Sequence, residues 1–249
     1  MNRTVIVTGG SKGLGASIVQ AFYNAGDQVA ILSRNDTGLA QSLGERARFI
    51  SVDISKPEQI KTAFGKVIQW TDTVDVLINN AGHSGWKPLG KIDEDFWDTM
   101  LATNLKGVLF ASQAAAAVMK NGSSIINISS LAGKRGSANN AVYCASKFGV
   151  NGITQSLAKE LGPRGIRVNA VCPVYLRTAG LEDALNEIDS PASGTDLTLF
   201  LNGFAKTQTA LGVLPTEKQV ADTCVFLSSK EAGAITGQCI NVDCGVMPQ

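Results

Sequence analysis

Short runs of β-branched and other apolar residues alternate with longer segments of helical spacing along the chain. Seven such runs predict buried strands, at residues 4–8, 28–33, 47–52, 74–79, 124–129, 166–171 and 238–242. Strands that alternate with helices are joined by right-handed crossovers, so their sheet is parallel and carries helices on both faces. We therefore expect an α/β fold with a doubly wound sheet of seven parallel strands.

Three local signals place helix ends between these strands. Gly26 follows the first helical segment and suits the left-handed position after a helix. Ser55 to Glu58 and Thr216 to Gln219 both match a capping box, in which a hydroxyl and a Glu or Gln three residues later satisfy backbone N–H groups. Each box predicts the start of a helix.

Residues 176–213 break the alternation. No linker or repeat divides the chain, so we expect residues 1–249 to form one domain, with this segment as an insertion that covers the substrate. Four apolar residues would give the insertion an inner face: Leu199, Phe200, Leu201 and Phe204. Ordinary amphipathic helix packing explains any one of them equally well.

Composition narrows the classes of function. Of the 249 residues 44% are apolar and 17% are charged, and the formal net charge is +1, so nothing suggests nucleic acid or a membrane as a partner. No apolar run reaches the ~18 residues of a membrane span, and the N-terminus does not resemble a secretory signal. The five cysteines form no C-x-x-C pair, which argues against a disulfide framework or a zinc site and favours a reducing cytoplasm.

The segment TGGSKGLG at residues 8–15 follows the first predicted strand. Gly9, Gly13 and Gly15 lack the β-carbons that would obstruct a tight turn, and N–H groups at the following helix start would face an anion. The spacing differs from the G-x-G-x-x-G dinucleotide fingerprint. The alternative interpretation is a glycine-rich strand-to-helix turn that binds nothing.

The stretch YCASK places Tyr143 and Lys147 four residues apart, on one face of a predicted helix. A phenol ordinarily loses its proton near pH ~10, and a neighbouring ammonium lowers its pKa. The pair is therefore either a tuned proton donor or two side chains at the surface.

Taken in order, the motifs of the chain resemble those of the short-chain dehydrogenase/reductase family over essentially the whole length. They are TGGSKGLG (8–15), Asp53, NNAG (79–82), TNLKG (103–107), INISSLAG (126–133), YCASK (143–147), RVNAVCP (167–173), Thr178 and NVD (241–243). The resemblance implies a Rossmann-like fold. It also implies an enzyme that interconverts a ketone or aldehyde and a secondary alcohol by hydride transfer with a nicotinamide cofactor.

Four residues would carry the chemistry that the resemblance implies. Tyr143 would donate the proton in reduction and accept it in oxidation, while Lys147 would lower the pKa of Tyr143 and hold the ribose hydroxyls. Ser130 would donate to the substrate oxygen, and Asn104 would bind a water linked to Lys147. The structural alternatives are a serine that bonds its own turn and an asparagine at a capped kink.

The same resemblance places cofactor-binding residues along the carboxyl ends of the strands. They are Gly9, Ser11, Lys12, Gly13, Leu14, Gly15, Ser33, Arg34, Asp53, Ile54, Asn80, Ala81, Gly82, Tyr143, Lys147, Pro173 and Thr178. Asp53 would contact the adenine and Thr178 the nicotinamide carboxamide, although either could serve as a turn or capping residue.

The end of the second predicted strand favours NADP(H) over NAD(H). An acidic residue there normally binds the ribose 2′-hydroxyl of NAD, but here Ser33 is followed by Arg34, and Lys12 lies in the glycine turn. Two cations without a carboxylate suit a 2′-phosphate. Asp36 would weaken this interpretation if the strand ended later, and both cations could also be solvated surface charges.

Two positions depart from the family pattern, because Val174 and Cys244 stand where glycines are usual. Val174 would crowd the nicotinamide or the substrate, and a positive φ there would be strained. Cys244 is interpreted as packing and not as a nucleophile. His83, the one histidine, follows NNAG and is a candidate for a structural role or a substrate contact.

The sequence thus predicts an NADP(H)-dependent oxidoreductase acting on a neutral or modestly polar alcohol or ketone. The alternatives are an NAD-dependent sugar or polyol dehydrogenase and a nucleotide-sensing binding protein without turnover, although family members of the latter kind generally lose the tyrosine or the lysine. By analogy with the family we expect a homotetramer, or a homodimer, assembled through two long helices, one of which is AVYCASKFGVNGITQSLAKEL.

Overall fold

Seven strands form one parallel sheet in the computed structural model, which describes residues 3–248. The strands are β1 (Thr4–Thr8), β2 (Gln28–Ser33), β3 (Ala47–Ser51), β4 (Val76–Asn79), β5 (Ser124–Ile128), β6 (Arg167–Pro173) and β7 (Cys239–Val242). Their order in the sheet is β3-β2-β1-β4-β5-β6-β7, and every neighbouring pair is parallel. The predicted fold class is confirmed.

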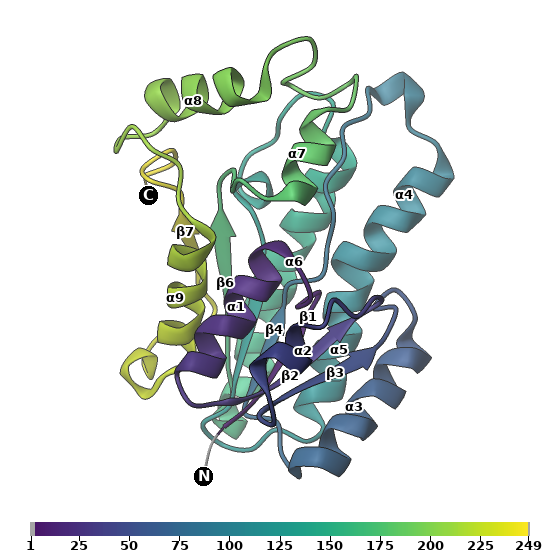
Figure 1. Ribbon diagram of the computed structural model, residues 1–249, viewed down its shortest axis with the longest axis vertical. Coiled ribbons are helices and arrows are strands. Elements are labelled where there is room, and N and C mark those ends of the chain that lie inside the picture. The colour runs from purple at the N-terminus through teal and green to yellow at the C-terminus, as the bar shows by residue number, and fades with distance from the viewer. Residues whose placement is uncertain (1–2, 249) are drawn as a thin grey trace.

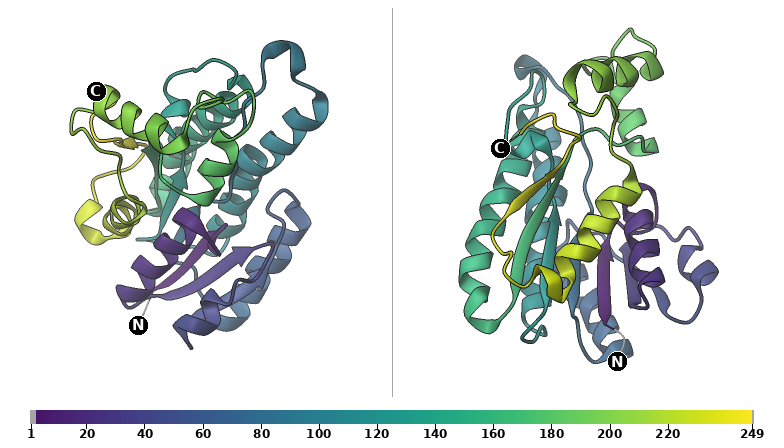
Figure 2. Two further views of the ribbon diagram at one scale, coloured as in Figure 1. Left: turned by 45° about the horizontal axis from the view of Figure 1, so that its top comes forward. Right: turned by 90° about the vertical axis from the view of Figure 1, so that its left-hand side faces the viewer.

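Helices cover both faces of this sheet (Figure 1). They are α1 (Gly13–Asn24), α2 (Leu39–Leu43), α3 (Pro57–Thr71), α4 (Glu94–Leu101), α5 (Gly107–Ala116), α6 (Ala141–Leu161), α7 (Ala179–Leu185), α8 (Leu197–Gln208) and α9 (Glu217–Ser228). Ile6 packs toward α3, α5 and α6, whereas its neighbours Val5 and Val7 pack toward α1 and α9. Successive side chains of a strand point to opposite faces, so both layers are built on fully buried strands. The right-hand view of Figure 2 shows the sheet between α6 on one side and α1 with α9 on the other.

A helix ends or begins at each of the three predicted places, and the predicted terminal residue is confirmed at two of them. Gly26 follows α1 with φ +96°, and Thr216 and Gln219 form a capping box at the start of α9. The box predicted at Ser55 is wrong. Lys56 precedes α3 without a side-chain cap, and the Ser55 hydroxyl donates to Asp53 instead, at 2.8 Å. Pro57 begins α3, and its fixed φ favours a helix start.

Residues 176–213 contain α7 and α8, which lie together at the end of the molecule where β6 finishes (Figure 1). Leu201 is fully buried in a small apolar cluster that includes Trp86, and Phe200 packs against it. Leu199 is 68% exposed and points outward, so its predicted place on an inner face is wrong. None of the helices between residues 3 and 248 has both the length and the apolar character needed to span a membrane.

Candidate active site

Asn104 lies in a π-helical turn, Ala102–Lys106, which joins α4 to α5. Its side chain is fully buried, and its Oδ1 accepts a hydrogen bond from the His83 N–H at 3.0 Å. Its Nδ2 donates to the His83 carbonyl oxygen at 2.8 Å. A π-helical turn adds one residue to a helix and often occurs at functional sites. The amide therefore fixes the loop after β4, a role that neither of the sequence interpretations included.

Tyr143 and Lys147 lie one turn apart near the start of α6, as predicted. The Lys147 Nζ is 5.7 Å from the centre of the Tyr143 ring and donates to the Ile128 carbonyl oxygen at 2.9 Å. Ser130 follows β5, and its side chain hydrogen-bonds the Tyr143 phenol. The Ser130 Oγ also accepts from the Ala132 N–H at 3.1 Å, so the turn-forming alternative holds together with the contact to Tyr143.

The electrostatics of this pair differ from the prediction. Burial raises the pKa of Tyr143 to about 12, and the hydrogen bond from Ser130 offsets only part of that rise. Burial also lowers the pKa of Lys147 to about 8. The expectation that Lys147 pulls the pKa of Tyr143 down is wrong for the protein's own groups, because the ammonium is directed at Ile128 and the loss of hydration dominates.

Gly82, in the loop after β4, lies directly against two of the catalytic candidates, Asn104 and Lys147. A β-carbon on Gly82 would lie 3.1 Å from the Asn104 Oδ1 and 3.7 Å from the Lys147 Nζ. The backbone of this loop therefore fills the space in front of the two side chains.

The glycine turn packs against the other side of the same loop. A β-carbon on Gly9 would lie 2.8 Å from the Ala81 Cα, and one on Gly15 would lie 2.1 Å from the Gly9 carbonyl oxygen. The Asn80 Nδ2 donates to the Gly9 carbonyl at 3.1 Å. The predicted phosphate cradle and the predicted catalytic residues are thus separated only by the NNAG segment. Gly9 and Gly13 have φ of +63° and +52°, as a tight turn of this kind requires.

Thr178 reaches the glycine turn from another strand at the same end of the sheet. It follows β6, and its Cβ lies 3.8 Å from the place of a β-carbon on Gly13. Its side chain also accepts from the Leu181 N–H at 3.2 Å and caps α7, so the capping alternative is observed. Pro173 ends β6 and is buried.

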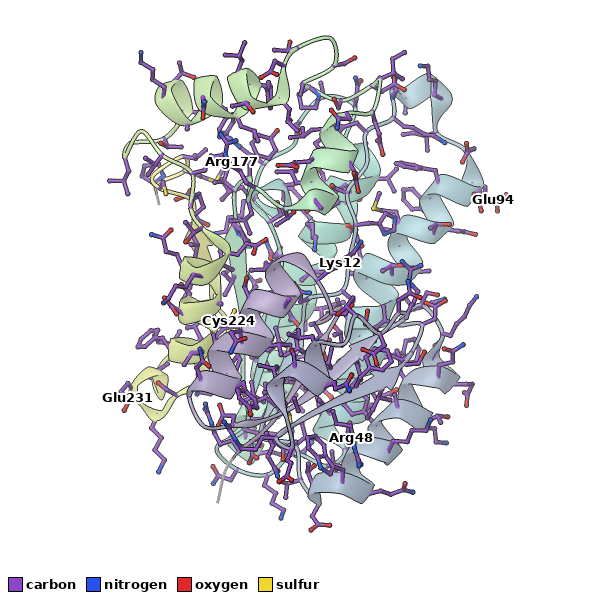
Figure 3. The ribbon with its side chains drawn as sticks, in the orientation of Figure 1. Lys12, Arg48, Glu94, Arg177, Cys224 and Glu231 are labelled. Carbon is purple, nitrogen blue, oxygen red and sulfur yellow. The ribbon has the colours of Figure 1, made fainter. Side chains whose placement is uncertain are left out.

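The predicted 2′-phosphate site lies around the end of β2, which finishes at Ser33 as predicted. The hydroxyls of Ser33 and Ser11 are 2.8 Å apart. Arg34 and Lys12 are exposed, and Figure 3 shows Lys12 at the start of α1. The Asp36 Oδ1 accepts from the Gly38 N–H of its own turn at 2.8 Å, so this carboxylate is engaged locally.

Asp53 and Ile54 follow β3 at the same edge of the sheet. The Asp53 carboxylate accepts from the Ser55 N–H and hydroxyl, which is the turn-forming alternative. Burial raises the pKa of Asp53, but those bonds and the positive charge of Arg34 outweigh it and hold the pKa below its usual value. Ile54 is buried, and its carbonyl oxygen lies 2.8 Å from the place of a β-carbon on Gly107. Leu14 packs on the apolar layer beneath α1.

The two departures from the family pattern have different outcomes. The non-glycine residues with positive φ between residues 3 and 248 are Asp72, Asn139 and Cys244. Val174 is not among them, so the strain considered for it does not arise. Cys244 has φ +53° and is therefore a strained position as well as a packing residue.

His83 lies in the loop after β4. Burial lowers the pKa of His83, and the positive charges of Arg34 and Lys147 act in the same direction.

Sequence reasoning missed Tyr175, which follows Val174. Its ring centre is 4.8 Å from that of Phe204, with the rings edge to face, and 6.1 Å from that of Phe200. Tyr175 also interacts electrostatically with Tyr143. Nearby, the Arg177 guanidinium donates to the Asn202 Oδ1 of α8 at 2.6 Å, and Figure 3 shows Arg177 beneath that helix. The signal in the sequence was an aromatic residue two positions after the β6 motif RVNAVCP.

Comparisons with known proteins identify the family of this chain. A family model described as enoyl-(acyl carrier protein) reductase matches residues 9–247. A 3-oxoacyl-(acyl-carrier-protein) reductase FabG of Chlamydia trachomatis serovar D is 32% identical, over 99% of this chain and 98% of the relative. The chain belongs to the short-chain dehydrogenase/reductase family. It is accordingly an oxidoreductase, and the alternative of a binding protein without turnover loses its support.

Solved structures of other members of the family have the same fold. A short-chain dehydrogenase/reductase named glucose/ribitol dehydrogenase, from Brucella melitensis, has a TM-score of 0.90 and 29% identity, with 100% of this chain and 98% of that chain covered. An actinorhodin polyketide ketoreductase variant with NADPH has a TM-score of 0.90 and 28% identity, with 98% and 97% covered. The family and the fold are therefore shown by sequence and by structure alike.

Proposed function

We propose that the protein reduces a ketone to a secondary alcohol with NADPH and that Tyr143 donates the proton. The observation that carries this proposal is the meeting of Tyr143, Ser130, Lys147 and Asn104 beside the loop that borders the glycine turn. A bound reduced nicotinamide supplies the hydride that forms the new C–H bond. The protein supplies the proton, the geometry and the donors to the oxygen that becomes negative.

Each side chain has a distinct part in the reduction. A phenol with a pKa of about 12 stays protonated at neutral pH and is ready to donate. The Ser130 hydroxyl, next to that phenol, donates to the carbonyl oxygen and orients it. Lys147 is protonated below about pH 8 and stabilises the phenolate that remains after transfer. Asn104 is a positioning residue, because it holds the backbone of His83 beside Gly82.

Tyr143→Phe tests the assignment of the proton donor, since it removes a single oxygen atom. We expect the turnover number for ketone reduction to fall at least ~10²-fold, the lower end of what general acid catalysis contributes. The dissociation constant for NADPH, measured by fluorescence, should change less than threefold. Tyr23→Phe is the matched control, because Tyr23 bonds the Leu43 carbonyl away from the site. A fully active Tyr143→Phe variant would sink the proposal.

The preference for NADP(H) is supported by the charges at the end of β2. The Ser11 and Ser33 hydroxyls stand together and two exposed cations flank them, while Asp36 is engaged in its own turn. The ketoreductase neighbour described above was crystallised with NADPH. We expect Arg34→Asp to lower the ratio of kcat/KM for NADPH over NADH at least tenfold. Lys66→Asp makes the same change of charge on α3 and should leave the ratio unchanged; a wild-type preference for NADH would contradict the assignment.

The substrate side of the site is bordered by aromatic rings. Tyr175, Phe200 and Phe204 form one cluster, and α7 and α8 with it would cover a bound substrate. An apolar wall of this kind favours a ketone on a carbon chain over a polyol. The relatives named 3-oxoacyl-(acyl-carrier-protein) reductases support a 3-oxoacyl thioester in particular.

An NAD-dependent sugar or polyol dehydrogenase is the second candidate, favoured by the similarity to the Brucella melitensis protein named glucose/ribitol dehydrogenase. A panel of acetoacetyl-CoA, cyclohexanone, glucose and ribitol separates the two. If the protein is an NADPH-dependent ketone reductase, kcat/KM with NADPH should be highest for acetoacetyl-CoA. Oxidation of ribitol or glucose with NAD at a higher kcat/KM would favour the second.

The oligomer is also a proposal. Three large apolar side chains are exposed on neighbouring helices, namely Trp97 on α4 (44%), Leu109 on α5 (42%) and Phe148 on α6 (48%). Their exposure supports a homodimer or homotetramer formed through α5 and α6. Light scattering of the wild type and of Phe148→Glu tests this: the wild type should have a multiple of the 26.1 kDa chain mass, and the variant should be smaller.

A further inference from the structure

Glu217, the first residue of α9, reaches across to the glycine turn at the start of α1. Its Oε2 accepts a hydrogen bond from the Ser17 hydroxyl of α1 at 2.8 Å. Its Oε1 lies 4.0 Å from the place of a β-carbon on Gly13, and the Thr178 Cβ lies 3.8 Å from the same place. A carboxylate and the Thr178 side chain therefore both border this glycine.

The start of α1 suits an anion, but the helix itself supplies none. Lys12 precedes α1 without a side-chain cap, and the first turn of the helix has no acidic residue. The first N–H groups of a helix have no partner within it, and together with the helix dipole they attract negative charge. Because no side-chain cap satisfies these donors, the start of α1 fits the diphosphate of the proposed cofactor. Glu217 is the negative charge that α9 brings to the same place.

The charge of Glu217 is not balanced by an ion pair. None of the ion pairs between residues 3 and 248 includes Glu217. Its neighbour Lys218 is paired with Asp222, one turn further along α9, at 2.7 Å. Glu217 is also half-buried, so salt and water screen its charge less than they would screen an exposed one. A diphosphate at the glycine turn would therefore meet an unbalanced charge of its own sign.

We propose that Glu217 weakens the binding of the cofactor diphosphate at the glycine turn and so speeds release of the oxidised cofactor. The carboxylate and the diphosphate repel each other, and both are attracted to the same helix end. Product release limits turnover in many enzymes, so a weaker hold on the cofactor favours repeated turnover. The inference rests on the proposed function in one respect, the binding of a pyridine nucleotide at this turn. It depends neither on the preference for NADP(H) nor on the identity of the ketone.

A series of charges at position 217 tests the proposal on the full-length protein. Glu217→Gln keeps an oxygen that can accept from Ser17 but removes the charge, and Glu217→Lys reverses the charge. At low salt we expect the dissociation constant for NADPH, measured by fluorescence, to fall about three- to tenfold in Glu217→Gln and further in Glu217→Lys. The rate of NADP⁺ release, measured by stopped flow, should fall in the same order. At about 0.5 M NaCl the difference between the wild type and Glu217→Gln should shrink, because salt screens the repulsion.

Glu231→Gln is the matched control and should bind NADPH as the wild type does. Glu231 is exposed in the short turn Lys230–Ala232 after α9, and Figure 3 shows it at the end of α9 that lies away from Lys12. Weaker binding by Glu217→Gln would overturn the inference, because the carboxylate would then support the site. Equal binding by the wild type and Glu217→Gln would contradict this inference alone. A wild type that binds neither NADPH nor NADH would contradict the proposed function itself.

Discussion

Replacing Gly133 by alanine offers a direct test of how the backbone positions Lys147. Gly133 is buried in the turn that follows β5, and α6 passes close to it. A β-carbon at Gly133 would lie 2.7 Å from the Lys147 carbonyl oxygen and 2.9 Å from both the Lys147 carbonyl carbon and the Asn151 Nδ2. Two of these three atoms belong to the helix backbone, so no flexible side chain can simply move aside.

The size of the effect follows from the distances. Ordinary contact with a β-carbon begins at 3.4 Å, so the helix at Lys147 must withdraw by 3.4 − 2.7, or about 0.7 Å. Overpacking of this kind costs about 1–3 kcal/mol of folding free energy. Catalytic groups must be held to within about 0.5 Å, and a misplacement of about 1 Å can cost ~10²-fold in rate. We therefore expect kcat for ketone reduction to fall about 10- to 100-fold in Gly133→Ala.

Urea unfolding and the turnover number at saturating NADPH measure the two effects separately. Gly65→Ala is the matched control, because Gly65 lies in the exposed middle of α3 and nothing stands within 4 Å of its added β-carbon. There alanine should raise the free energy of unfolding by roughly 1 kcal/mol and leave kcat unchanged. A Gly133→Ala variant with the wild-type midpoint and the wild-type kcat would refute the reasoning.

Three further predictions concern single groups. The pKa of Lys147 is about 8, so its charge is present below that pH and lost above it; kcat/KM for reduction should fall as the pH rises past about 8, and a profile flat to pH 10 would contradict this. Cys244→Gly should raise the free energy of unfolding by about 0.5–1 kcal/mol, because it relieves the left-handed strain at φ +53°, roughly 1–2 kcal/mol, against the larger unfolded-state entropy of glycine. Thr216→Ala should lower the free energy of unfolding by about 1 kcal/mol, through loss of the capping box at α9, without altering kcat; an unchanged urea midpoint would count against the cap.

The strands and the order of motifs could be read from the sequence because their causes are local. Buried parallel strands are short apolar runs, and β2 ends at Ser33 because the apolar run ends there. The closeness of the candidate site residues also follows from position, since the carboxyl ends of parallel strands meet at one edge. The capping box at Ser55 failed because α3 begins at Pro57, so that Lys56 and not Ser55 is the N-cap residue, while the Ser55 hydroxyl donates to Asp53. Spacing alone does not reveal a helix start displaced by one residue.

The pKa of Tyr143 and the contact of Tyr175 with Phe204 could not be predicted from the sequence, for a different reason. The pKa of Tyr143 depends on how deeply α6 buries the phenol and on where the Lys147 ammonium points, and both are properties of packing. Likewise, Tyr175 meets Phe204 only because α8 folds back over the end of β6. The π-helical turn at Asn104 has no periodic signature, since one added residue leaves the apolar pattern on either side intact.

The residue added by the π-helical turn determines which face of α5 points toward the sheet. Each residue of an α-helix turns the chain by about 100°, so deleting one position from the turn Ala102–Lys106 would let α4 run smoothly into α5 but would rotate α5 about its own axis. Val108, Ala111 and Ala115, which α5 buries, would then swing off the sheet. The π-helical turn is therefore required by the packing of α5 against the core. A chain that lacked the extra residue would lose the buried contacts of that whole helix.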